Sequence, residues 1–335
     1  PPAQAQQVLS RVAYRGGTAI QHLPGNGSTV TAAAWSPDGR TAVTGTFDGQ
    51  VRVWDGQTFT LVKEFQALDR RLGGLEFSPD GRLLLVRTSG DDVFQNAISL
   101  WDMQTGVLLH RLIGHTSHLN SAHFSPDGRY VISSSDDDTI RLWDVTSGEE
   151  VGQTPFSFSF GGLSNLGQVL FSRDGRLIYA LSDLATNSQR PLMRLWDSIT
   201  LQYRGEQALS AEGGCGVAVL SPDGQQLACS QGLTASATMR LVDIQTGTLI
   251  RRFADVTDIV NNIAFAPDGK WLAAATSRGV YLWDVKTGER IHTFHEGSNM
   301  MNALAFSPDG RFLLSDRESP TNDEATVWKA SLDSG

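Results

Sequence analysis

The sequence predicts an all-β protein built from seven copies of a four-stranded antiparallel unit. A four-residue turn motif recurs seven times, beginning at Ser36, Ser78, Ser125, Ser172, Ser221, Ala266 and Ser307. Successive copies lie between 41 residues (Ala266 to Ser307) and 49 residues (Ser172 to Ser221) apart. Apolar side chains alternate with other residues beside each turn, which is typical of strands with one buried face. A repeat of this length predicts a closed ring of four-stranded blades, a β-propeller.

The turn motif explains the first two strands of each unit. It reads Ser-Pro-Asp-Gly in most copies, with Arg173 replacing proline once and Ala266 replacing serine once. Proline sets φ for a type I turn, and glycine provides the positive φ that returns the chain. The residue before each turn is large and apolar: Trp35, Phe77, Phe124, Phe171, Leu220, Phe265 and Phe306. Each copy therefore predicts a tight hairpin between two strands.

The third strand of most units ends in a Trp-Asp pair. The pairs are Trp54-Asp55, Trp101-Asp102, Trp143-Asp144, Trp196-Asp197 and Trp283-Asp284. A polar bend and a fourth strand, such as Val107–Leu112, follow. The last unit has no fourth strand, whereas Thr18–Leu23 precedes the first unit where such a strand would lie. We predict that Thr18–Leu23 pairs with the last third strand and closes the ring, which removes two exposed strand edges.

The unit that contains Gly114-His115, Ser125–Gly128 and Tyr130–Asp144 resembles a WD40 repeat, and the resemblance extends over roughly Thr18 to Ala330. It implies a seven-bladed propeller that serves as a platform for other proteins. It also implies that one set of residues forms a hydrogen-bonded structural tetrad and not a hydrolase triad: His115, Ser133, Asp137 and Trp143. We expect a linker at residues 1–17, a single propeller domain at 18–331 and a tail at 332–335.

Variation in loop length indicates a recognition face. The distance from the turn glycine to the Trp position is 15, 20, 15, 21, 18, 14 and 18 residues in the successive units, whereas the other two turns are uniform. Alternate connections of an antiparallel blade emerge on the same side, so the variable ones should share one face, where binding sites are common. The connection after Asp144 is also long and contains three phenylalanines.

A further signal is the varied residue seven positions before each turn, at the start of the innermost strand. The predicted partner-binding residues are Arg70, Arg71, His118, Phe156, Phe158, Phe160, Ile259 and Met300.

Composition and motifs exclude several classes of function. The formal charge of −9 argues against general nucleic-acid affinity, which needs a basic face. No apolar run reaches the roughly 18 residues of a membrane span. No phosphate-binding loop, zinc-ligand spacing or nucleophile motif is present, so we expect no catalytic residue, metal or cofactor. Cys215 and Cys229 do not fall opposite each other about their turn, which favours two buried thiols over a disulfide.

The leading hypothesis is therefore a module that binds a protein or peptide partner, either alone or as the recognition part of a longer chain. One alternative is a propeller that binds a small ligand or acts as an enzyme through its central channel. Its candidate polar groups are Asn120, Gln168, Asn261, Asn262 and Asn302. Another alternative is a structural subunit that contacts neighbours through its blade edges or through the face that carries the uniform turns. The compartment stays open: two cysteines permit either the cytoplasm, which is slightly favoured, or an exported location.

Overall fold

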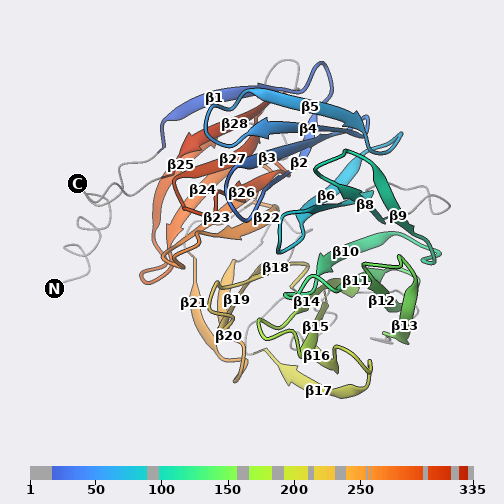
Figure 1. Cartoon of the computed structure of the whole chain (residues 1–335). Coiled ribbons are helices and arrows are strands. Elements are labelled where there is room, and N and C mark those ends of the chain that lie inside the picture. Colours follow the sequence, from blue (N-terminus) through green and yellow to red (C-terminus); the bar gives the residue numbers. More distant parts are fainter. Residues whose placement is uncertain are drawn as a thin grey trace.

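The chain forms seven antiparallel four-stranded sheets arranged as the blades of a propeller (Figure 1). The computed structural model describes residues 17–88, 98–156, 166–182, 192–209, 215–230, 239–253, 256, 258–296, 301–317 and 324–330. The predicted all-β fold with seven blades is confirmed.

The first four blades follow the chain in order, each from its innermost to its outermost strand. Blade 1 consists of β2 (Val30–Trp35), β3 (Thr41–Thr46), β4 (Gln50–Asp55) and β5 (Leu61–Gln66). Blade 2 consists of β6 (Leu72–Phe77), β7 (Leu83–Thr88), β8 (Ile98–Asp102) and β9 (Leu108–Leu112). Blade 3 consists of β10 (Leu119–Phe124), β11 (Tyr130–Ser135), β12 (Thr139–Asp144) and β13 (Glu150–Pro155). Blade 4 consists of β14 (Leu166–Phe171), β15 (Leu177–Ser182), β16 (Leu192–Asp197) and β17 (Tyr203–Ala208).

The last three blades complete the ring. Blade 5 consists of β18 (Val217–Leu220), β19 (Gln226–Ser230), β20 (Arg240–Asp243) and β21 (Leu249–Arg252). Blade 6 consists of β22 (Val260–Phe265), β23 (Trp271–Thr276), β24 (Gly279–Asp284) and β25 (Arg290–Glu296). Blade 7 consists of β26 (Leu304–Phe306), β27 (Phe312–Arg317), β28 (Glu324–Lys329) and β1 (Ala19–Pro24). The innermost strands of neighbouring blades contact each other all the way round.

The ring is closed by the first strand of the chain. β1 pairs antiparallel with β28, and His22 lies opposite Thr326. This pairing confirms the predicted closure by the N-terminal segment. Most side chains of β1 are exposed, but Leu23 is fully buried against Ala325 and Val327 of blade 7 and Val30 of blade 1. The closing strand is therefore held by both hydrogen bonds and apolar packing.

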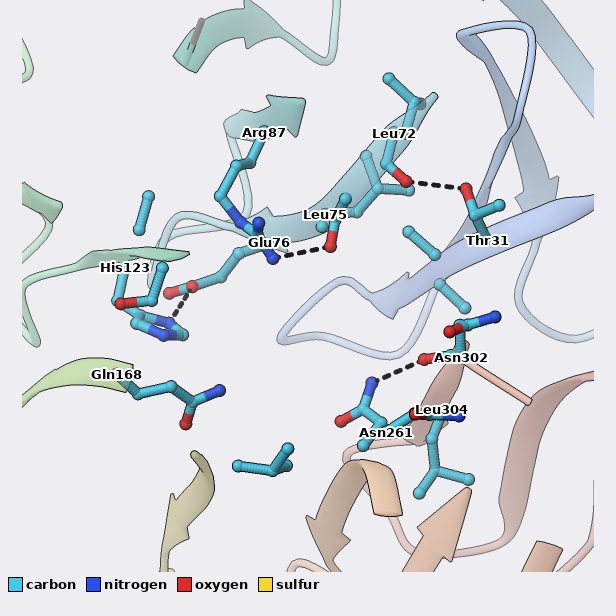
Figure 2. A pocket seen from close by; sticks show the side chains of 18 of the residues that line it. Thr31, Leu72, Leu75, Glu76, Arg87, His123, Gln168, Asn261, Asn302 and Leu304 are labelled. Carbon is cyan, nitrogen blue, oxygen red and sulfur yellow. Dashed lines mark hydrogen bonds and ion pairs between the residues drawn. The ribbon is translucent and has the colours of Figure 1, made fainter. Parts of the chain in front are cut away.

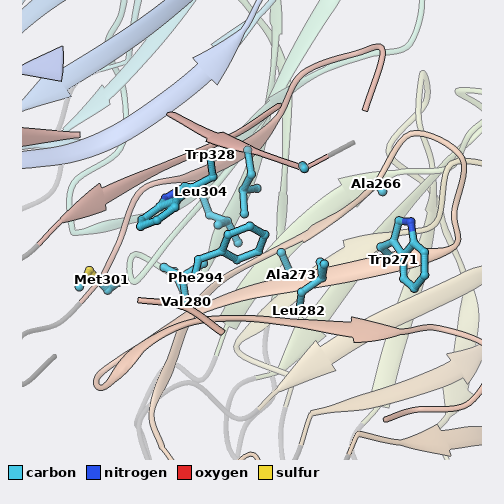
Figure 3. Packing of buried hydrophobic residues seen from close by; sticks show 12 residues of the cluster. Ala266, Trp271, Ala273, Val280, Leu282, Phe294, Met301, Leu304 and Trp328 are labelled. Carbon is cyan, nitrogen blue, oxygen red and sulfur yellow. The ribbon is translucent and has the colours of Figure 1, made fainter. Parts of the chain in front are cut away.

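The hydrophobic core is divided among the interfaces between blades. Seven clusters of buried residues each join one blade to the next. Figure 3 shows the cluster between blades 6 and 7, where Phe294 packs on Trp328 with ring centroids 5.7 Å apart. Burying one such side chain contributes about 2 kcal/mol. A blade alone would leave both of its broad faces in water, so the blades are stable only as a ring.

The turns obtain their shape from the side chains of the motif. In blade 3 the Ser125 hydroxyl donates to Asp127 Oδ1 at 2.6 Å and accepts from the Tyr130 N–H at 3.0 Å. Gly128 has a φ of 72°, which L-residues adopt only with strain. The same serine–aspartate bond forms in every other blade whose turn begins with serine. The predicted hairpins are thus present with the expected chemistry.

The two cysteines form a disulfide within blade 5, with their Cα atoms 5.3 Å apart. The prediction of two buried thiols was wrong. Counting from the turn gives the register of this hairpin correctly, with Ala218 opposite Cys229. Cys215, however, lies before the start of β18 and outside the paired residues, so the register does not determine which side chain it contacts.

Candidate functional site

The loops between the second and third strands lie beside the starts of the innermost strands. The backbone N–H groups of Phe47, Asp136 and Ser277 donate to the carbonyl oxygens of the residues seven positions before the turns, at 2.8, 2.9 and 2.9 Å. Those acceptors are Thr29, His118 and Ile259. We call this side of the propeller the variable-loop face. The turn motifs and the third-to-fourth bends lie together on the opposite, constant-turn face, as the 2.9 Å bond from Val145 N–H to Arg129 O shows.

The structure brings part of the predicted recognition set to the variable-loop face. Arg71, His118 and Ile259 are partly exposed at the starts of their innermost strands. Arg70 is next to Arg71 and pairs with the exposed carboxylate of Asp69 at 3.3 Å. The His118 ring lies 3.9 Å from the Asp136 carboxylate. Phe158, Phe160 and Met300 lie outside the described residues.

Phe156 belongs to the core and not to the surface. Its side chain is 1% exposed and packs on Trp196, with ring centroids 5.5 Å apart. Its backbone N–H donates to the Asp138 carbonyl at 2.7 Å. The residues that follow the outermost strands of blades 1, 4 and 5 are also buried and apolar: Ala67, Leu209 and Phe253. Phe156 is the blade 3 member of this series and lies 13 residues after its Trp, as Ala67 and Leu209 do, a signal that alignment of the repeats on their Trp-Asp pairs would have given.

The innermost strands surround a cavity of about 350 Å³ on the propeller axis. Figure 2 shows Arg87, Glu76 and His123 on one side of it and the amides of Asn261 and Asn302 on another. Polar groups in the wall include the candidates Asn120, Gln168, Asn261, Asn262 and Asn302. Several of them bind neighbouring blades. The Asn261 and Asn262 amides donate to the carbonyl oxygens of Met301 and Asn302, at 2.9 and 3.0 Å.

Glu76 and His123 link blades 2 and 3 inside the channel. The Glu76 carboxylate lies 2.7 Å from His123 Nδ1 and accepts from the Phe124 N–H at 3.1 Å. The negative charge of Glu76 is thus engaged by its immediate neighbours.

Two arginines approach each other at the channel wall of blade 2. Arg87 donates from Nη2 to the Gly73 carbonyl at 2.7 Å and from Nη1 to the Leu119 carbonyl at 3.3 Å. Burial and the positive charge of Arg71 lower the pKa of Arg87 to about 10. The Arg71 guanidinium lies 5.9 Å from the ring centroid of Phe47, within cation–π range. This part of the channel is therefore electropositive in a protein of net negative charge.

A buried carboxyl group on blade 7 faces the same region. Asp316 accepts from the Asn302 N–H at 2.8 Å through Oδ2, whereas its buried Oδ1 has no hydrogen-bond partner among the described residues. Burial raises the pKa of Asp316 to about 7, although three backbone N–H groups and the charge of Arg71 act in the opposite direction. Asp316 therefore carries only part of a negative charge at neutral pH.

Sequence reasoning missed Phe47, Arg87 and Asp316, although the repeats contain a signal for them. The position nine residues after the start of each turn motif is occupied by Gly45, Arg87, Ser134, Leu181, Ser230, Ala275 and Asp316. Only blades 2 and 7 have a charged residue there. Two positions later, blade 1 has Phe47 where blades 3 and 6 have Asp136 and Ser277. Each repeat can be compared with the other six, and these three residues differ from those at the equivalent positions of most other repeats.

We predict that Asp316→Asn stabilises the protein at pH 8 more than at pH 5. The folded-state pKa of Asp316 lies above its unfolded value, so its contribution is fully present below pH 3.8 and is lost as pH rises through 7. An uncharged asparagine cannot ionise, so the variant does not lose stability in this way. The difference in free energy of unfolding between the variant and the wild type should therefore grow by about 2 kcal/mol from pH 5 to pH 8. Urea unfolding at both pH values measures the difference. The exposed Asp268→Asn serves as control, and an advantage of Asp316→Asn that is independent of pH would contradict the prediction.

The tetrad residues of blade 3 form one chain of hydrogen bonds. His115 Nδ1 lies 2.8 Å from Asp137 Oδ2, His115 Nε2 lies 2.8 Å from Ser133 Oγ, and the Trp143 indole donates to Ser133 Oγ at 2.8 Å. The side chains of His115 and Asp137 are 2% and 6% exposed. The serine is held between two rings beneath the surface, an arrangement that joins a loop to its blade.

The indole bond also occurs in blades without a matching histidine. Trp54 donates to Thr44 Oγ1 and Trp328 to Ser315 Oγ, both at 2.9 Å. Within the part of the chain that the structure describes, no group of three or more His, Cys, Asp or Glu side chains could hold a metal ion. The described residues also contain no helix that is long and apolar enough to span a membrane.

Comparisons with known proteins agree with the fold. The family model described as WD domain, G-beta repeat, matches residues 17–55, 106–144, 247–284 and 288–318. An uncharacterized WD repeat-containing protein of Deinococcus radiodurans is 42% identical over 64 residues, or 19% of this chain. The match spans 24% of that protein's length. Each segment matched by the family model begins at the outermost strand of one blade and continues into the next blade. Four segments of this chain thus match the WD40 repeat, and the whole chain folds into a closed ring of seven blades, a β-propeller.

Proposed function

We propose that this propeller is an interaction module that binds a protein or peptide partner through its variable-loop face. The observation that supports the proposal most directly is the pairing of Phe47 with Arg71 beside the channel. Phe47 is 57% exposed, which is unusual for a residue of its size and apolar character. Exposed aromatic residues and arginines are common at the energetic centre of protein interfaces. WD40 propellers generally serve as scaffolds for other proteins, which is in keeping with this role.

The proposal assigns no catalytic step to the chain. The His, Ser and Asp side chains that resemble a triad are buried, and their hydrogen bonds are taken up within the tetrad. The propeller could carry out recognition as one domain of a longer protein. In that case the variable-loop face would receive either a separate partner or another segment of the same polypeptide.

The test uses matched substitutions on opposite faces. The purified chain is screened against an unbiased display library of peptides, and the selected peptides are titrated by fluorescence anisotropy. We predict that Phe47→Ala weakens binding at least about tenfold, as loss of an interface hot spot does. The control Ile199→Ala removes an apolar side chain that is 71% exposed on the constant-turn face and should leave affinity unchanged. The reverse result would move the site to the constant-turn face and refute the proposal.

A second candidate is a small polar ligand in the channel. The specific observation in its favour is the 350 Å³ cavity with amide side chains in its wall. Native mass spectrometry of the purified chain measures whether a bound molecule adds to its mass. A bound metabolite whose release follows Asn261→Leu, together with a failed peptide screen, would favour this candidate over the interaction module.

A further inference from the structure

The positive charge beside blade 2 is only partly neutralised by the residues around it, through the partly ionised Asp316. Arg71 and Arg87 both line the channel and are close enough for the charge of Arg71 to lower the pKa of Arg87. Among the described residues, neither guanidinium forms an ion pair with a carboxylate. Glu76, which also lines this wall, is engaged by His123. Two like charges that form no ion pair raise the free energy of the channel, and a bound anion would lower it.

The two arginines have different roles. Arg87 uses Nη1 and Nη2 to hold the carbonyl oxygens of Leu119 and Gly73, so it contributes charge and fixes the backbone. Arg71 has no hydrogen bond to the described residues, and its Nε is buried without a partner. Its contact with the Phe47 ring limits its orientation without using its N–H groups. Arg71 is therefore the residue with donors available to a ligand.

Asp316 restricts the charge of that ligand. Its carboxyl group interacts with Arg71 but forms no ion pair with it among the described residues, and burial keeps it partly protonated at neutral pH. A group with two negative charges would meet stronger repulsion from the ionised fraction of Asp316. A singly charged planar carboxylate suits one guanidinium, which can donate two parallel hydrogen bonds to it.

We propose that Arg71, with Phe47 beside it and Arg87 behind it, binds the carboxylate of an aspartate or glutamate side chain in a partner peptide. The inference rests on the proposed function and specifies the chemistry of the partner at that site. The apolar ring of Phe47 covers the stem of the acidic side chain, while the guanidinium binds its head. The unusual residues of blades 1, 2 and 7 thereby form one site at the channel mouth.

The test is a selection with two matched libraries of ten-residue peptides displayed against the full chain. One library has glutamate fixed at its central position and the other has glutamine there, with all other positions random. Peptides from the first library are titrated by fluorescence anisotropy against the wild type, Arg71→Gln and Asp316→Asn. Each peptide is also made with the central glutamate replaced by glutamine, a change that leaves the fold of the protein untouched. Arg176→Gln, an exposed arginine on the constant-turn face, is the control.

The proposal predicts a specific pattern of affinities. The peptide change and Arg71→Gln should each weaken binding about tenfold, and together they should cost little more than either alone because they remove the same contact. Asp316→Asn should strengthen peptide binding, because it removes a competing negative charge. Added salt should weaken the binding of the peptide to the wild type, because it screens the attraction between the carboxylate and Arg71. Arg176→Gln should have no effect.

Two outcomes would overturn the proposal. Peptides that bind through the variable-loop face but tolerate both Arg71→Gln and the glutamine replacement would refute carboxylate recognition and leave the interaction module intact. Binders recovered only from the glutamine library would also refute it. The proposed function is judged separately, by the effect of Phe47→Ala on peptides from the unbiased library, so the two can fail independently.

Discussion

Replacing Asp137 by asparagine should lower the free energy of unfolding by about 3 kcal/mol at pH 7. Asp137 accepts hydrogen bonds from four groups: the His115 ring at 2.8 Å, the Thr116 N–H at 2.9 Å, and the N–H and hydroxyl of Thr139 at 3.0 and 2.6 Å. An asparagine would turn an amide N–H₂ toward donors and leave them unsatisfied beneath the surface. Chemical denaturation at pH 7 measures the loss.

The neighbouring Asp136→Asn is the matched control, since that carboxylate is 41% exposed and should cost less than about 1 kcal/mol. The pH dependence gives a second readout. Burial alone would raise the pKa of Asp137, but the hydrogen bonds from His115, Thr139 and Thr116 outweigh it and hold the pKa well below its usual range. The contribution of Asp137 to the free energy of unfolding is therefore present above pH 3.8 and is lost as pH falls through the pKa of Asp137 in the folded state. Equal decreases in the free energy of unfolding for Asp137→Asn and Asp136→Asn would show that the tetrad does not stabilise the fold more than an exposed carboxylate does.

Truncating Leu23 to alanine should cost about 3 kcal/mol, the usual loss for a fully buried leucine. Leu23 is the buried anchor of β1 and packs between blades 7 and 1 with Val30, Ala325 and Val327. The cavity would weaken the two blades that the closing strand holds together. Urea unfolding measures the loss, and native-state hydrogen exchange of β28 shows whether the closure itself opens more often.

Ile20→Ala provides the comparison on the same strand. Ile20 is 44% exposed, so its truncation should change the free energy of unfolding by less than about 0.5 kcal/mol. If both substitutions had the same small effect, closure would depend on the backbone hydrogen bonds to β28 and not on apolar packing.

The fold could be predicted because the motifs that specify each turn and strand recur in seven repeats. Turn motifs such as Ser125–Gly128 specify hairpins, alternating apolar residues specify strands, and the missing last strand implies closure by the first. These signals depend on neighbours in the sequence. The disulfide between Cys215 and Cys229 could not be predicted in the same way, because Cys215 lies outside the paired residues of blade 5 and the register does not determine its neighbours.

The candidate site was harder to predict from the sequence than the fold, for a related reason. Arg71 was found because it occupies a variable position at a strand start. Phe47, Arg87 and Asp316 lie on three different blades, and Asp316 of blade 7 joins the other two only when the ring closes. Phe156 was misplaced because an apolar residue in a long connection can equally be a core residue, and its packing on Trp196 shows that it belongs to the core.

The pairing of β1 with β28 determines when the molecule can be completed during synthesis. His22 and Thr326, which contact each other across this pair, are 304 residues apart in the chain. At about 5–20 residues per second, a ribosome needs roughly 15–60 s between making the two partners. Throughout that time β1 has no strand to pair with, and blade 7 must be the last to form.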